Sequence, residues 1–69
     1  MIKPGTILPC DRLSDEGYKI VAVIGYANDW AAYKWPTDRS DDDVARNGDK
    51  LFTNEAKEYF PELKLPYRR

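Results

Sequence analysis

Acidic side chains are the residues of this 69-residue chain with the most obvious capacity for chemistry. Asp41–Asp43 stand in a row, and Gly48 follows them at a distance that invites comparison with an EF-hand calcium loop. A loop with its glycine at Gly48 would begin at Asp43. It would then have Ala45 at the third position and Asn54 at the twelfth, where a bidentate glutamate is needed. Because two ligands fail, we expect no metal site.

Nucleophilic and acid–base chemistry has few candidates. Histidine is absent, which excludes Ser-His-Asp and Cys-His systems and every histidine metal site. Cys10 is the only cysteine, so zinc clusters and redox pairs are excluded too. We interpret Cys10 as a half-buried small apolar residue; a reactive thiol is the alternative, which the adjacent negative charge of Asp11 disfavours. Paired carboxylates could serve a glycosidase, but so short a chain has little room for a cleft. We expect a non-enzymatic protein without cofactors.

The composition predicts one small folded domain, residues 1–69. Hydrophobic residues make up 42% of the chain and aromatic residues 13%, which is too apolar for a disordered segment. The formal charge is −1, so no net attraction to nucleic acid or membranes is expected. The N-terminus lacks the apolar core of a signal peptide, and no apolar run is long enough to cross a membrane. Together with the lone cysteine, these features predict a soluble, monomeric, cytoplasmic protein.

Charge is distributed unevenly along the chain. Residues 1–37 are neutral, with four basic and four acidic groups. Residues 38–62 hold eight acidic groups against four basic ones, and residues 63–69 hold three basic groups. The near-neutral total therefore hides an acidic helical segment, residues 38–62, and a basic tail, residues 63–69, whose cations are Lys64, Arg68 and Arg69.

The first half of the chain, residues 1–37, has the pattern of β-strands. The best predicted strand is residues 18–26, which are rich in β-branched residues and apolar on both faces, so that this strand is expected to be central. Residues 27–29 form a plausible hairpin loop, and residues 30–35 return as the next strand until Pro36 ends it. Residues 6–8 add a short strand before Pro9.

The second half has the signals of two short helices. Ser40 is the expected N-cap of a helix over residues 41–47, with Gly48 as its C′ residue. Thr53 is the expected N-cap of a helix over residues 54–60, which Pro61 ends. The pattern predicts an α+β fold: a small antiparallel sheet of about three strands with both helices packed on one face. Residues 63–67 could add an edge strand.

Trp30 stands beside the predicted hairpin loop and allows two interpretations. If Tyr33 and Trp35 share the core face with Ala31, Trp30 points the other way and could be an exposed anchor for a partner. The alternative is that Trp30 packs against the outer face of the neighbouring strand. Most of the nine aromatic residues must belong to the core of so small a domain.

The acidic segment is the strongest functional candidate. Glu55 and Glu58 lie on one helix face, and if the two helices pack side by side, their carboxylates form one negative surface. Carboxylates spaced along a rigid scaffold can imitate a phosphate backbone. The alternative is a solvated face with interleaved cations, namely Arg39, Arg46, Lys50 and Lys57. The predicted partner-binding residues are Asp38, Asp41, Asp42, Asp43, Glu55, Glu58, Glu62 and Trp30.

With this acidic segment on a histidine-free, cysteine-poor frame, the chain resembles small phage-encoded anti-CRISPR inhibitors. The resemblance is one of general character across the whole chain, without a shared motif. It implies a protein that covers a basic DNA-binding surface of a CRISPR effector in the bacterial cytoplasm. Two other functions stay open: a nucleic-acid-binding regulator that uses the basic tail Lys64, Arg68 and Arg69, and a structural subunit of a larger assembly.

Overall fold

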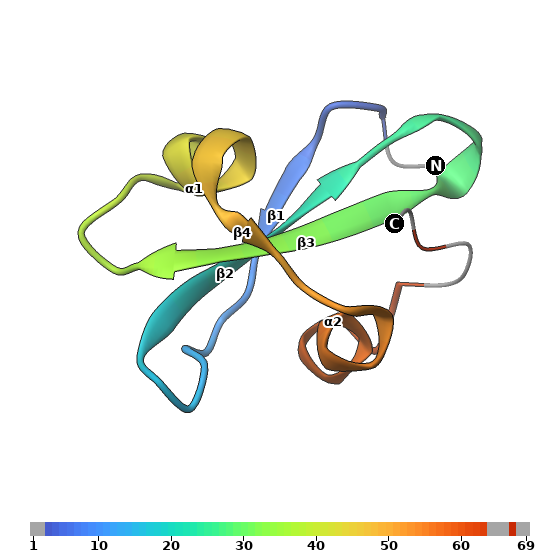
Figure 1. Cartoon of the computed structure of the whole chain (residues 1–69). Coiled ribbons are helices and arrows are strands. Elements are labelled where there is room, and N and C mark those ends of the chain that lie inside the picture. Colours follow the sequence, from blue (N-terminus) through green and yellow to red (C-terminus); the bar gives the residue numbers. More distant parts are fainter. Residues whose placement is uncertain (1–2, 64–66, 68–69) are drawn as a thin grey trace.

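A computed structural model describes residues 3–63 and residue 67 (Figure 1). Its single antiparallel sheet has the spatial order β1-β2-β3-β4, which is also the order of the strands in the chain. The α+β class is confirmed, with one strand more than expected: β4 is a two-residue strand inside the segment predicted to be helical. The strands are β1 (Ile7–Pro9), β2 (Tyr18–Ile24), β3 (Trp30–Pro36) and β4 (Asp49–Lys50), and the helices are α1 (Asp41–Asn47) and α2 (Thr53–Tyr59).

The β2–β3 hairpin is the centre of the sheet. Its register runs without interruption from the Tyr18–Pro36 pair to the Ile24–Trp30 pair. The connection is a single turn of 3-10 helix over Tyr26–Asn28, in which Ala27 has a left-handed backbone with φ of 56°. Because β2 lies between β1 and β3 and is apolar on both faces, both of its faces need cover.

The alternation of side chains along β2 and β3 defines two faces of the sheet. The Trp30 face carries Ile20, Ala22, Ile24, Trp30 and Ala32, and the Tyr33 face carries Lys19, Val21, Val23, Ala31, Tyr33 and Trp35. The Trp30 face contains most of the hydrophobic core.

The two helices lie on opposite faces, not on one face as the sequence pattern suggested (Figure 1). Helix α2 covers the Trp30 face, where the rings of Phe60 and Trp30 meet edge to face with centroids 5.9 Å apart. Helix α1 covers the Tyr33 face, and Asp41 forms an ion pair of 3.0 Å with Lys19 there. The physical reason is the apolar character of both faces of β2, which one layer of helices cannot bury.

Trp30 belongs to the core. Only 1% of its surface is exposed, and its ring contacts Phe60 and Tyr67 edge to face. It does point away from Tyr33 and Trp35, as the alternation predicted, but α2 and Tyr67 cover that face as well. The prediction that Trp30 is an exposed binding anchor is therefore wrong.

The helix ends agree with the sequence at α1 and differ at α2. The hydroxyl of Ser40 accepts a hydrogen bond of 3.2 Å from the backbone N–H of Asp43, as a capping side chain does. Helix α2 begins one residue earlier than expected, so its N-cap is Phe52, whose side chain caps nothing, and Thr53 lies inside the helix. Gly48 ends α1 with an ordinary φ of −71°, so it is not the left-handed C′ residue that the sequence suggested.

Tyr67, a residue of the predicted basic tail, packs against the hydrophobic core. Its ring contacts Trp30 with centroids 4.7 Å apart, and its hydroxyl links β3 to Leu51, the residue that follows β4. The backbone N–H of Ala32 donates to this hydroxyl at 3.3 Å, and the hydroxyl donates to the carbonyl of Leu51 at 2.5 Å. The other residues of the proposed edge strand, apart from Leu63, and the basic residues of the tail lie outside the described residues.

Replacement of Tyr67 by phenylalanine should change how the free energy of unfolding depends on pH. Burial raises the pKa of Tyr67 above its ordinary value, although the hydrogen bond from Ala32 acts in the opposite direction. The raised pKa means that the folded state keeps the phenolic proton. The contribution of the hydroxyl is then complete below about pH 10, the pKa of unfolded tyrosine, and is lost as the pH rises through the folded value.

We therefore expect Tyr67→Phe to lower the free energy of unfolding at pH 7 by about 1–2 kcal/mol, because it leaves the buried N–H of Ala32 without a partner. Above about pH 10 the difference between the two proteins should shrink. Urea denaturation of both proteins at neutral and alkaline pH measures this. A difference that stays constant across the range would contradict the role of the hydroxyl.

Candidate functional site

The predicted acidic residues of α1 are neutralised by cations around them. Asp41 pairs with Lys19 across to β2, Asp42 pairs with Arg46 at 3.3 Å, and Asp43 pairs with Arg39 at 3.3 Å. All three carboxylates also lie in the first turn of the helix, where negative charge is favourable. Stabilisation of the start of α1 therefore accounts for these three aspartates without a partner-binding role.

The one negative surface that was expected from both helices does not form. Helices α1 and α2 cover opposite faces of the sheet, so their carboxylates are separated by the sheet itself. Asp38 is exposed in the connection between β3 and α1, away from α2. The predicted acidic residues therefore form two separate groups: Asp38 and Asp41–Asp43 lie at and before the start of α1, and Glu55, Glu58 and Glu62 lie on α2 and the turn that follows it.

These three glutamates instead face the connection between β1 and β2. One hollow is bordered by Asp11 and Arg12 from this connection and by Glu58 and Glu62. A second hollow is bordered by Asp15, Glu16 and Glu55. We call the combined set the α2 acidic surface; its members are Asp11, Asp15, Glu16, Glu55, Glu58 and Glu62.

Arg12 fixes the connection against the helix. Its guanidinium donates a hydrogen bond of 3.0 Å to the backbone carbonyl of Glu58 and lies over the ring of Tyr59 at 4.5 Å. None of the ion pairs between described residues includes Arg12, so its charge is not paired with a carboxylate. Lys34 lies 3.6 Å from Glu16 on the sheet side of the second hollow.

The remaining carboxylates of the α2 acidic surface are free to meet a partner. Within the part of the chain that the structure describes, no ion pair involves Asp11, Asp15, Glu55, Glu58 or Glu62. Leu13 lies in the same connection and is 53% exposed, which adds an apolar side chain to a mainly charged region. Protein interfaces combine apolar contacts with polar ones, and this connection offers both kinds of side chain.

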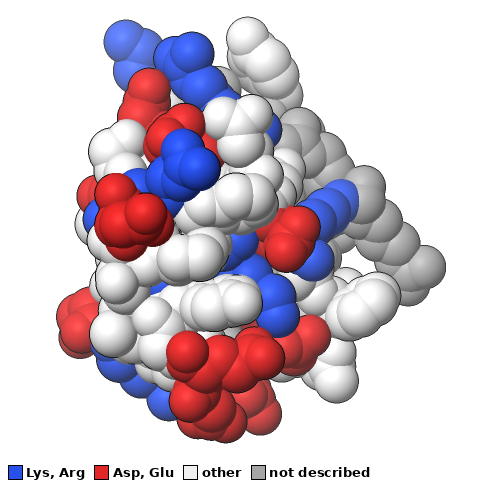
Figure 2. All heavy atoms as spheres, turned by 60° about the vertical axis from the view of Figure 1, so that its left-hand side comes forward, with Lys and Arg blue, Asp and Glu red and all other residues white. Residues whose placement is uncertain are grey.

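Sequence reasoning missed half of this surface. Asp11, Asp15 and Glu16 belong to the first half of the chain, which has no net charge and therefore gave no reason to expect an acidic surface. Figure 2 shows a dense group of acidic side chains at the lower end of the molecule, whereas acidic and basic side chains alternate over the rest of that face. The only available signal was the acidic character of residues 11–16 themselves, because their neighbours on α2 are distant in the chain.

Metal binding and membrane insertion find no support in residues 3–63 and 67. No group of three or more His, Cys, Asp or Glu side chains among them is arranged to hold a metal ion. No helix in the same part of the chain has the length and apolar character needed to cross a membrane. Cys10 is half-buried, with its thiol 3.6 Å from the carbonyl of Tyr59.

Comparison with known proteins gives no relative from which a role could be transferred. No protein-family model matches the chain, and neither the curated proteins nor the solved structures contain a significant match. The function is therefore argued from the surface alone.

Proposed function

We propose that this protein is a non-enzymatic inhibitor that binds a basic surface of a protein partner through the α2 acidic surface. The observation that carries the proposal is the convergence of six carboxylates from two segments, the β1–β2 connection and α2. Such a surface suits a channel that normally holds the phosphates of DNA. A CRISPR effector in the bacterial cytoplasm is the specific partner we propose.

Rigidity supports this mode of binding. The connection is anchored by the bond of Arg12 to α2, and α2 is anchored by Phe60 against Trp30. The backbones that carry the carboxylates are therefore already in place, so that binding a basic partner needs to order only the exposed side chains. Their excess of negative charge should also accelerate association by long-range steering, an effect that salt screens.

The test measures binding of target DNA by purified, guide-loaded CRISPR effectors in the presence of the protein. We expect one effector type to lose DNA binding as the protein is added. The double variant Glu58→Lys with Glu62→Lys should need a concentration at least about tenfold higher for the same inhibition, and its salt dependence should be flatter.

Asp42→Lys is the matched control, because it reverses an exposed charge on the opposite side of the sheet. It should change inhibition by no more than about twofold while lowering stability by about 1 kcal/mol at the start of α1. Equal effects of the two variants would reject the α2 acidic surface as the contact. If no effector loses DNA binding, the specific partner is wrong.

A further inference from the structure

Phe52 breaks two local rules of stable folding. As the N-cap of α2 it offers no side-chain acceptor to the first N–H groups of the helix, a position where Ser, Thr, Asp or Asn is favoured. It is also a large apolar side chain that is 77% exposed. Local choices that oppose the fold without compensation tend to mark functional positions.

The strand that leads to Phe52 has a free edge. Strand β4 is the last in the sheet, and the N–H of Leu51 donates to the carbonyl of Ala32 at 2.9 Å. Because polar groups alternate in direction along an antiparallel strand, Asp49 and Leu51 face β3, and Lys50 points its N–H and C=O away from the sheet. The edge is short, because β4 has two residues, so a further strand would pair with the N–H and C=O of Lys50 alone.

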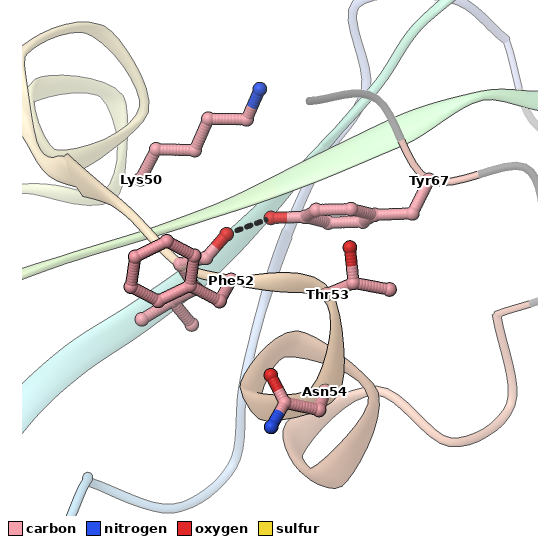
Figure 3. A pocket seen from close by; sticks show the side chains of 6 residues that line it. Lys50, Phe52, Thr53, Asn54 and Tyr67 are labelled. Carbon is pink, nitrogen blue, oxygen red and sulfur yellow. Dashed lines mark hydrogen bonds between the residues drawn. The ribbon is translucent and has the colours of Figure 1, made fainter.

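A mainly apolar hollow lies beside this edge. Its volume is about 570 Å³, and Leu51, Phe52 and Tyr67 contribute its apolar lining, with Thr53 and Asn54 along α2. Figure 3 shows the hydroxyl of Tyr67 held by Leu51 and the side chain of Lys50 extending away from Phe52. No ion pair between described residues includes Lys50, so its ammonium group is available to a ligand.

We propose that an extended segment of a partner protein adds to the edge of β4 as a further strand. An apolar side chain of that segment enters the hollow against Phe52, and an acidic side chain lies beside Lys50. Each element selects one property of the occupant: the strand edge selects an extended backbone, the hollow an apolar residue, and the lysine a negative charge. A second copy fits less well, because symmetric pairing centred on Lys50 would bring two ammonium groups together.

This surface is independent of the proposed inhibitory function. None of the residues that line the hollow belongs to the α2 acidic surface, and the occupant carries the opposite charge from the basic partner proposed above. The two contacts can therefore fail or succeed separately.

The test begins with selection of random peptides of roughly twelve residues on the immobilised full chain, a length that can span a strand. The enriched peptides should alternate apolar and polar residues and include an acidic one. Phe52→Ser and Lys50→Glu should each weaken binding of the best peptide by about tenfold or more. Peptide binding should also slow hydrogen exchange at the backbone amide of Lys50.

Tyr26→Ser is the matched control, because Tyr26 is 82% exposed at the far turn of the β2–β3 hairpin. It should leave peptide binding unchanged within about twofold. Circular dichroism should show that all three variants fold, since each replaces an exposed side chain. The proposal is overturned if no peptide is enriched, if Phe52→Ser binds as well as the original chain, or if the Lys50 amide exchanges as fast with peptide as without it. Self-association that Phe52→Ser abolishes would overturn it in favour of a second copy.

Discussion

Trp30→Ala is expected to lower the free energy of unfolding by about 3–5 kcal/mol, the usual range for removal of a fully buried aromatic side chain. Domains of this size have a total stability of roughly 3–10 kcal/mol, at about 0.05–0.15 kcal/mol per residue. The variant should therefore lose a large part of the total stability, and towards the lower end of that range it would be largely unfolded at 25 °C. Its ring fills the space between Phe60 and Tyr67, and neither ring can close the gap without leaving its other contacts.

Urea denaturation and circular dichroism measure this effect. Tyr26→Ala is the control, because it removes an aromatic ring that is almost fully exposed and should change stability by no more than about 0.5 kcal/mol. If Trp30→Ala kept its stability and lost only partner binding, Trp30 would be an anchor after all, and the packing described here would be wrong.

Gly48→Ala should destabilise the fold by about 2–3 kcal/mol, in the upper part of the range for overpacked sites. An added Cβ would lie 2.5 Å from the carbonyl oxygen of Val44 and 2.9 Å from that of Lys34. Both atoms belong to the backbone, in α1 and in β3, so a change of side-chain rotamer cannot relieve the overlap. The sheet and the helix would have to separate.

Gly48→Asn distinguishes steric overlap of the added Cβ from the other common reason for a glycine after a helix, a left-handed backbone. At a left-handed C′ position asparagine is tolerated better than alanine. Gly48 has a negative φ, so asparagine gains nothing from the backbone and brings a larger side chain. Thermal denaturation should therefore show Gly48→Asn to be no more stable than Gly48→Ala, and a clearly more stable asparagine variant would point to backbone conformation instead.

Local signals in the sequence were sufficient for much of the secondary structure. The β-branched residues of β2 identified the central strand, and Ser40 with its capping hydroxyl gave the bounds of α1 as they are observed. The central strand and the start of α1 both depend on residues that are close in the chain, so a local sequence pattern can predict them.

The sequence contained a signal for helices on both faces of the sheet, but the prediction placed both helices on one face. Residues 18–24 are apolar on both faces, which already requires cover on both faces of the sheet. The burial of Trp30 depends on Phe60 and Tyr67, and the α2 acidic surface depends on the β1–β2 connection meeting α2. These contacts join distant segments, and no local pattern specifies them.

The order of the sheet has a consequence for how the chain folds. Every strand pairs with its neighbour in the sequence, so the strand pairs can form one after another, although the connection between β3 and β4 also contains α1. The contacts that cover the Trp30 face join distant segments, and the hydroxyl of Tyr67 must reach back 35 positions to Ala32. We expect this contact to form last and to open first, so that brief opening of the Trp30 face precedes unfolding of the sheet as a whole.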